Sequence, residues 1–239
     1  GAVELTLALH YVFSTPEDKI LWDVGHQAYA HKIITGRKEL FPRLRQMGGL
    51  SPFINPAESI YDPFVSGHAG NAISAASGIC EAFEITGNPA HVIAVIGDGS
   101  LSNGLTFEGL NFAGVRKQNL IVVLNDNEMF ISSRVGALAD YLSRLMTSRT
   151  MRGVKEGVKS TLRTMPLIGD ALYRLSKHIE TNLKGVVVSG SNLFEEMGFR
   201  YIGPIDGHNI AHLVEGFHNI SRMQGPIFMH VITEKGHGY

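Results

Sequence analysis

Cysteine is nearly absent from this chain, and so is any excess of charge. Among 239 residues there is one cysteine, Cys80, and 21 lysines and arginines stand against 22 aspartates and glutamates. A single cysteine excludes an intramolecular disulfide and a metal cluster built from cysteines, so we expect Cys80 to pack in the core on a helix. Balanced charge gives no support to the binding of nucleic acid or of an anionic membrane surface.

Long apolar runs are absent as well. No run reaches the roughly 18 to 20 residues that a membrane span needs, and residues 1–6 lack the charged start and apolar centre of a signal peptide. We therefore expect a cytoplasmic protein with neither membrane nor nucleic-acid partners. The chain opens without methionine in a segment that already has a helical pattern, so we also expect further residues upstream in the native protein.

Helical and strand-like segments alternate along the chain. This alternation is typical of βαβ units and predicts an α/β fold, a parallel sheet with helices on both faces. The predicted strands are 20–24, 92–96, 120–124 and 227–233. The predicted helices are 3–13, 35–46 (on the surface), 71–86, 105–115 and 210–222. Two short segments complete the predicted fold, 192–197 and 201–204. A loop rich in glycine and proline, 48–63, has the length of a functional or mobile segment.

The segment from 135 to 184 has a different pattern. Apolar residues recur there at helical spacing in two stretches before Pro166. The pattern predicts a helical insertion at about 135–184 within one domain that spans 1–239. Its basic residues would line a charged groove or, more simply, a solvated helix face.

Two polar motifs stand where neighbouring predicted strands end. Gly97-Asp98-Gly99 follows the run 92–96, and Asn125-Asp126-Asn127 follows the run 120–124. The carboxyl ends of parallel strands are where open α/β sheets bind ligands. Carboxylate and amide oxygens suit Mg²⁺, which takes its remaining ligands from water and phosphates, and a glycine lets the backbone approach a phosphate. The motifs predict a metal and diphosphate site, with simple strand ends and turn caps as the competing interpretation.

The pattern from Gly97-Asp98-Gly99 to Asn127 resembles the signature of thiamine-diphosphate enzymes. Nearly the whole chain is similar to one transketolase-like family among them, the 1-deoxy-D-xylulose-5-phosphate synthases. That similarity is carried by the segments 1–6, 22–29, 125–129, 135–138 and 201–208, of which 22–29 and 125–129 best separate it from transketolase. The resemblance implies a diphosphate-type thiamine-diphosphate-binding domain.

The resemblance also implies roles for individual residues. Asp98, Asn127 and the carbonyl of Met129 would hold Mg²⁺. His26 and His68 would be catalytic, as donors near the reacting centre. The residues implied to bind the cofactor are His26, Gly67, His68, Ala69, Gly99, Ser100, Asn127 and Tyr239.

Two departures from the family pattern qualify these roles. The chain has Ala69-Gly70-Asn71 where many relatives place serines and threonine, and Phe130 where a small serine is common. Hydroxyl contacts at these positions are therefore lost, which indicates a divergent branch or altered substrate handling.

The resemblance implies an enzyme that decarboxylates pyruvate and joins the two-carbon unit to glyceraldehyde 3-phosphate. Such enzymes are homodimers, and their pyrimidine-binding and C-terminal domains have no counterpart in this sequence, so we expect the chain by itself to be inactive. Two other hypotheses stay open. The chain would be the N-terminal subunit of a split transketolase-like enzyme, or a non-catalytic phosphate-binding α/β module, although neither a dinucleotide fingerprint nor a phosphate loop is found.

Overall fold

A computed structural model describes residues 1–127 and 192–238 of the chain. The predicted insertion at 135–184, together with Met129, Phe130 and Tyr239, lies outside these ranges. The described residues belong to one compact unit, Gly1–Ser133 and Phe194–Tyr239, apart from the start of helix α8 (Asn192–Glu196).

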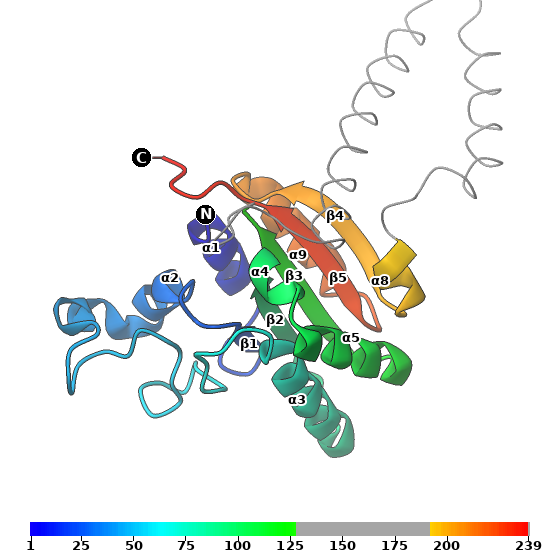
Figure 1. The fold of residues 1–239 in the computed structure, drawn as a ribbon, viewed down its shortest axis with the longest axis horizontal. Helices are drawn as coiled ribbons and strands as arrows, with labels where there is room; N and C mark the ends of the chain where they lie inside the picture. Colours follow the sequence, from blue (N-terminus) through cyan, green and yellow to red (C-terminus); the bar gives the residue numbers. More distant parts are fainter. Residues whose placement is uncertain (128–191, 239) are drawn as a thin grey trace, which may run out of the picture. The chain divides into compact units, whose positions relative to one another are not determined.

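The centre of this unit is a five-stranded sheet in which all neighbouring strands are parallel (Figure 1). Its order is β1-β2-β3-β5-β4. The strands are β1 (Lys19–Trp22), β2 (Val92–Gly97), β3 (Leu120–Asp126), β4 (Arg200–Asp206) and β5 (Ile227–Ile232). Each strand predicted from an apolar run is present, and the α/β fold is confirmed.

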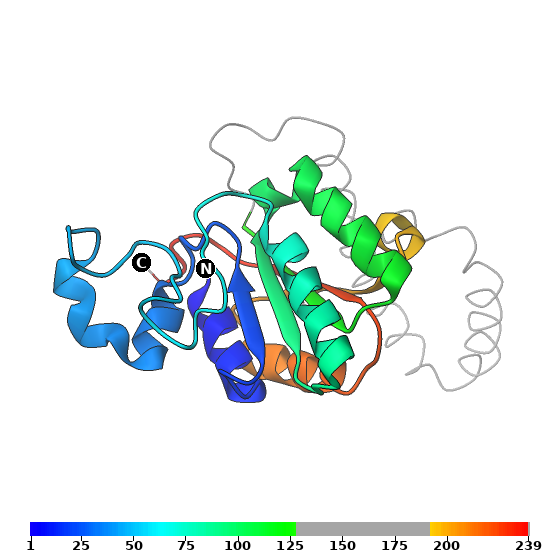
Figure 2. The ribbon, with the colours of Figure 1, turned by 90° about the horizontal axis from the view of Figure 1, so that it is seen from below.

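Helices cover both faces of the sheet (Figure 2). Helices α1 (Val3–Val12) and α9 (Ile210–Ile220) pack together on one face, and α3 (Ala72–Thr86) and α5 (Gly104–Arg116) pack on the other. Within β2, Ile93 and Val95 join the core under α1 and α9, while the residues between them are equally buried. Burial on both faces explains why the strands are continuous apolar runs rather than alternating ones.

Helix α3 also carries the single cysteine. Cys80 is buried there, which confirms its predicted role in core packing. Burial, together with the nearby Glu81 carboxylate, raises the pKa of its thiol to about 12. The thiolate is therefore strongly disfavoured at neutral pH, and Cys80 is chemically inert.

The prediction of one surface helix over 35–46 is wrong. The chain instead forms three short turns: α2 (Tyr29–Lys32), a π-helical turn (Ile33–Arg37) and a 3₁₀ segment (Lys38–Arg43). Gly36 has a φ of 89°, which breaks the α-helical path. Lys32 and Arg37 are buried rather than solvated. Sequence polarity was misleading at Arg37 because its anionic partner Asp62 is buried with it. Lys32, just before the predicted helix, pairs with the partly exposed Glu58.

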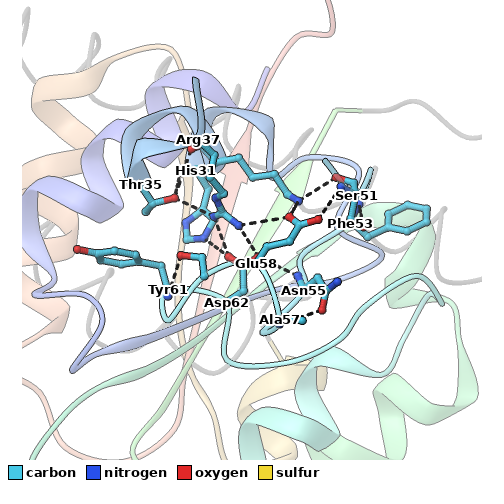
Figure 3. Close-up of polar contacts among 12 residues, drawn as sticks. His31, Thr35, Arg37, Ser51, Phe53, Asn55, Ala57, Glu58, Tyr61 and Asp62 are labelled. Carbon is cyan, nitrogen blue, oxygen red and sulfur yellow. Dashed lines mark hydrogen bonds and ion pairs between the residues drawn. The ribbon is translucent and has the colours of Figure 1, made fainter. Parts of the chain in front are cut away.

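The partners come from the loop 48–63 (Figure 3). The Asp62 carboxylate accepts two hydrogen bonds from the Arg37 guanidinium, at 2.6 and 2.8 Å, and further ones from His31 Nε2 at 3.0 Å and the Asn55 amide at 2.8 Å. Neither the Asp62 nor the His31 side chain is exposed to solvent. Because three groups donate four hydrogen bonds to Asp62, the loop is anchored to α2 and to the turn that follows it.

A second ion pair reinforces this anchor. The fully buried Lys32 ammonium donates to Glu58 Oε2 at 2.7 Å and to the Ser51 carbonyl at 2.8 Å. The other carboxylate oxygen of Glu58 accepts from the Ser51 amide at 2.6 Å. Two cations thus face two carboxylates, Glu58 and Asp62, and their charges balance inside the fold.

At the amino ends of the strands, His91 joins two elements that are distant in sequence. Its Nδ1 donates to Asp18 at 3.1 Å and its Nε2 donates to the Ser221 carbonyl at 2.9 Å, so both ring nitrogens carry protons. The hydrogen bond to Asp18 outweighs burial and raises the pKa of His91. Burial acts to raise the pKa of Asp18, but hydrogen bonds from His91 and Ser14 outweigh it and leave this pKa below its usual value.

This pair gives a pH-dependent prediction. His91 stabilises the fold fully below its ordinary pKa of 6.5 and loses that effect as pH rises through the raised folded value, while Asp18 loses its effect as pH falls through a value below 3.8. The stability difference between the wild type and His91→Ala is therefore expected to be largest between these limits, with a pH-dependent part of at most about 1 kcal/mol because the ring is partly exposed. Urea denaturation at a series of pH values measures it. His218→Ala, on the exposed side of α9, is the control, and equal pH profiles for the two variants would contradict the prediction.

Candidate functional site

The two predicted metal ligands lie at the ends of adjacent strands. Asp98 begins the short helix α4 (Asp98–Leu101) directly after β2 and is 4% exposed, and Asn127 directly follows β3. In the register of β2 and β3, Gly97 pairs with Asn125, so both polar motifs reach the same edge of the sheet. The Asp98 carboxylate accepts the Gly99 amide at 2.8 Å. The structure thus brings the two motifs together as the sequence predicted.

A cleft of about 480 Å³ opens beside Asn127. Its polar lining comes from Asn125 and Asn127, from His26 and Gln27 in the turn after β1, and from Lys235 after β5. The start of the chain, Gly1, Ala2 and Val3, and the side of α2, Tyr29 and Ala30, complete the lining. The cleft therefore combines hydrogen-bond donors and one cation with a predicted metal ligand.

His26 is exposed in this cleft, and its pKa is lowered. Partial desolvation by the surrounding chain is the largest cause of the lowered pKa, the Asp23 carboxylate opposes it, and the Lys235 ammonium adds to it. A histidine with a lowered pKa is neutral at pH 7, with one nitrogen that donates and one that accepts. His26 can therefore donate a hydrogen bond to an anion or exchange a proton.

The predicted residues Gly67, His68 and Ala69 lie in a loop that is fixed at both sides. The buried carboxylate of Asp23 accepts the Gly70 amide at 2.9 and 3.0 Å and the Ala72 amide at 3.1 Å. Asn103 Nδ2 donates to the Ala69 carbonyl at 2.9 Å. His68 and Ala69 are exposed and are not among the residues that line the cleft. The end of the loop, at the N-terminus of α3, is thus held beside Asp23, which precedes the turn of His26.

Gly99 and Ser100 lie in α4 beyond Asp98. Gly99 is exposed, and a Cβ at this position would meet nothing within 4 Å, so its backbone is open to a ligand. Ser100 is buried, and its carbonyl accepts from Thr106 Oγ1 at 2.7 Å, which holds α4 against the start of α5. Of the predicted site residues, Met129 and Tyr239 belong to the parts of the chain that are not described.

Side chains from β4 and β5 hold the end of β3 through polar contacts. His230 Nε2 lies 3.1 Å from Asp126 Oδ2, and His230 Nδ1 lies 2.8 Å from the Tyr201 hydroxyl. Asp126 and His230 are fully buried. Because Asp126 directly precedes Asn127, this chain of contacts fixes the backbone from which Asn127 projects.

Sequence reasoning missed several residues around the cleft. Asp23 and Gln27 flank His26, Thr233 and Lys235 follow β5, and Asn125 was quoted only as part of a motif. A signal existed for Asp23 and Gln27, since both belong to the block 22–29 that carries the resemblance. Thr233 was predicted only as the last residue of a strand, and Lys235 only as part of the segment that ends in Tyr239.

Glu4, His208 and His237 form a cluster of metal-ligating types next to the cleft. His208 Nε2 accepts the Glu234 amide at 2.7 Å, so a neutral ring carries its proton on Nδ1, which lies 3.3 Å from Glu4. Both nitrogens are thereby engaged, and no nitrogen of His208 is left for a metal. The His208 amide donates to the Asp206 carboxylate at 2.9 Å, which closes a turn after β4. The ring also holds the segment with Lys235 against α1.

Across the described ranges, we find no helix that combines the length and the apolar character needed to cross a membrane.

Comparison with solved structures identifies the class of fold. Transketolase from Campylobacter jejuni subsp. jejuni NCTC 11168 superposes with a TM-score of 0.61 at 17% identity, over 95% of this chain and 32% of that one. Transketolase from Leishmania mexicana gives 0.58 at 18% identity, over 95% and 29%. The chain therefore has the α/β fold found in these transketolases.

The chain belongs to the 1-deoxy-D-xylulose-5-phosphate synthase family, whose sequence model matches residues 1–233. The 1-deoxy-D-xylulose-5-phosphate synthases of Desulforudis audaxviator and Syntrophus aciditrophicus are 54% and 51% identical to it over all 239 residues. The chain spans 38% and 37% of the length of these two relatives. The resemblance seen in the sequence is confirmed, and the higher identity to the synthases disfavours a transketolase subunit.

Proposed function

We propose that this chain binds thiamine diphosphate and Mg²⁺ at the carboxyl edge of its sheet, as the diphosphate-binding part of a 1-deoxy-D-xylulose-5-phosphate synthase. The observation that carries the proposal is the placement of Asp98 and Asn127 at the ends of register-paired strands. The substrates of the whole enzyme would be pyruvate and glyceraldehyde 3-phosphate, and the whole enzyme would be a homodimer.

The residues present fit a metal diphosphate. The carboxylate of Asp98 and the amide oxygen of Asn127 are the hard ligands that Mg²⁺ takes in proteins, with phosphate oxygens and water in the remaining positions. Beside Asn127, the cleft offers the Lys235 ammonium and the Gln27 amide to an anion. The Met129 carbonyl, outside the described residues, is proposed as the third protein ligand.

The remaining predicted site residues would bind and orient the cofactor and the substrate. The open backbone at Gly99 allows close approach of a phosphate, and the anchored loop of Gly67, His68 and Ala69 presents the His68 ring. Neutral His26 would donate to a phosphate oxygen or exchange a proton with the substrate. Ser100 and Tyr239 are proposed as further contacts. When bound, the cofactor supplies the electron sink for decarboxylation.

Titration calorimetry tests this function directly. The 239-residue chain is expected to bind thiamine diphosphate when Mg²⁺ is present, and EDTA is expected to abolish the heat because the diphosphate is held largely through the metal. ATP and NAD with Mg²⁺ are the comparison ligands. Tight binding of ATP without any thiamine-diphosphate signal would overturn the proposal in favour of a general phosphate-binding module.

A further inference from the structure

Gln27 lies at the centre of the carboxyl edge and has no assigned role. It follows His26 in the turn after β1, lines the cleft, and reaches across the end of β2 to the end of β3. Its Nε2 lies 3.4 Å from the position that a Cβ on Gly97 would take. A side chain at position 97 would therefore begin in van der Waals contact with the Gln27 amide, which places this amide directly against the end of β2.

Hydrogen bonds from Thr233 and Asn125 orient this amide. Thr233 Oγ1 donates to Asn125 Oδ1 at 2.7 Å, and Asn125 Nδ2 donates to Gln27 Oε1 at 2.7 Å. With the Thr233 hydroxyl as the donor, the Asn125 nitrogen faces Gln27, and the Gln27 oxygen accepts from that nitrogen. In this row of hydrogen bonds each donor points the same way, from Thr233 after β5, through Asn125 in β3, to Gln27 in the turn after β1.

The amide nitrogen of Gln27, at the end of this row of hydrogen bonds, is left to donate. Gln27 Nε2 makes no hydrogen bond to any residue of the described ranges, although it carries two N–H groups. It lies beside Gly97, at the start of the motif that contains Asp98, and in the same cleft as Asn127. The donor thus lies at the edge of the sheet that carries both predicted metal ligands, beside the residue that precedes Asp98 and in the same cleft as Asn127.

We propose that Gln27 is a further diphosphate-binding residue, whose Nε2 donates to a phosphate oxygen of the metal diphosphate. This inference rests on the proposed function, because the anion it contacts is the diphosphate of that cofactor. Thr233 and Asn125 act as positioning residues, since they orient the amide with its nitrogen toward the ligand. Orientation before binding means that little side-chain freedom is lost when the ligand arrives.

The decisive variant is Gln27→Glu. Its shape is unchanged and one carboxylate oxygen still accepts from Asn125, but the donor is replaced by an anionic oxygen that faces the phosphate. The affinity for thiamine diphosphate with Mg²⁺, measured by calorimetry, is expected to fall about 10- to 100-fold, the range for losing a hydrogen bond to a charged group. Mg²⁺ with inorganic pyrophosphate, as a second probe, should lose a similar factor because the contact is to the diphosphate.

Two further variants separate binding from folding. Gln46→Glu adds the same charge at an exposed position and should bind like the wild type. Gln27→Met removes the donor without adding charge and should weaken binding of thiamine diphosphate about 10-fold. Urea denaturation of each variant shows whether it is folded. If Gln27→Glu is unfolded, Gln27→Met replaces it as the test. If the wild type binds and both Gln27 variants bind within about 3-fold of Gln46→Glu, this inference is wrong while the proposed function stands. If the wild type binds neither probe, both fail.

Discussion

Replacing Asp98 with Asn is expected to weaken the Mg²⁺-dependent binding of thiamine diphosphate by about 100-fold or more. The variant keeps an oxygen that can accept the Gly99 amide, so the start of α4 is preserved, but it removes the negative charge offered to the metal. Loss of a group that only supports a metal ligand already costs about 10- to 100-fold, and loss of a charged ligand should cost at least as much. Calorimetry at a fixed Mg²⁺ concentration measures the change.

Glu108→Gln is the matched control for Asp98. This residue is exposed on α5, so the variant loses one negative charge away from the carboxyl edge and should bind like the wild type. If the Asp98 variant retains Mg²⁺-dependent binding within about 3-fold of the control, Asp98 is not a ligand of the metal.

Replacing Asp62 with Ala is expected to lower the free energy of unfolding by about 3–5 kcal/mol, because it leaves the buried Arg37 guanidinium without its main partner. Urea denaturation measures this loss. Burial acts to raise the pKa of Asp62, but hydrogen bonds from His31 and Arg37 outweigh it and hold this pKa well below its usual range. The carboxylate therefore contributes above its ordinary pKa, and the contribution is lost only as pH falls through the depressed value.

A control and a double variant sharpen this test. Glu39 is exposed in the same stretch, so Glu39→Ala should change stability by no more than about 0.5 kcal/mol. Arg37→Met in the Asp62→Ala background removes the unpaired charge and should restore part of the loss. Equal stabilities of the Asp62 and Glu39 variants would show that the network in Figure 3 does not hold the loop.

The sequence by itself determined most of the sheet and its helices. The runs 92–96 and 120–124 are apolar throughout because both faces of β2 and β3 are buried, so periodicity and length identified them. The motifs at Asp98 and Asn127 could be located for the same reason, since parallel strands all end at one edge. The block 22–29 carried the resemblance to the family that the comparisons then confirmed.

Only the tertiary structure decided how polar side chains pair across long separations. The stretch 35–46 was predicted to be a surface helix because Asp62, the partner of Arg37, lies 25 residues away. Lys32, at the end of α2, likewise pairs with Glu58 over 26 residues. Gln27 showed no role until Asn125 and Thr233, 98 and 206 positions further along the chain, were placed beside it. Apolar burial leaves a local periodic record in the sequence, whereas a hydrogen bond depends on the positions of two particular atoms, which only the folded chain brings together.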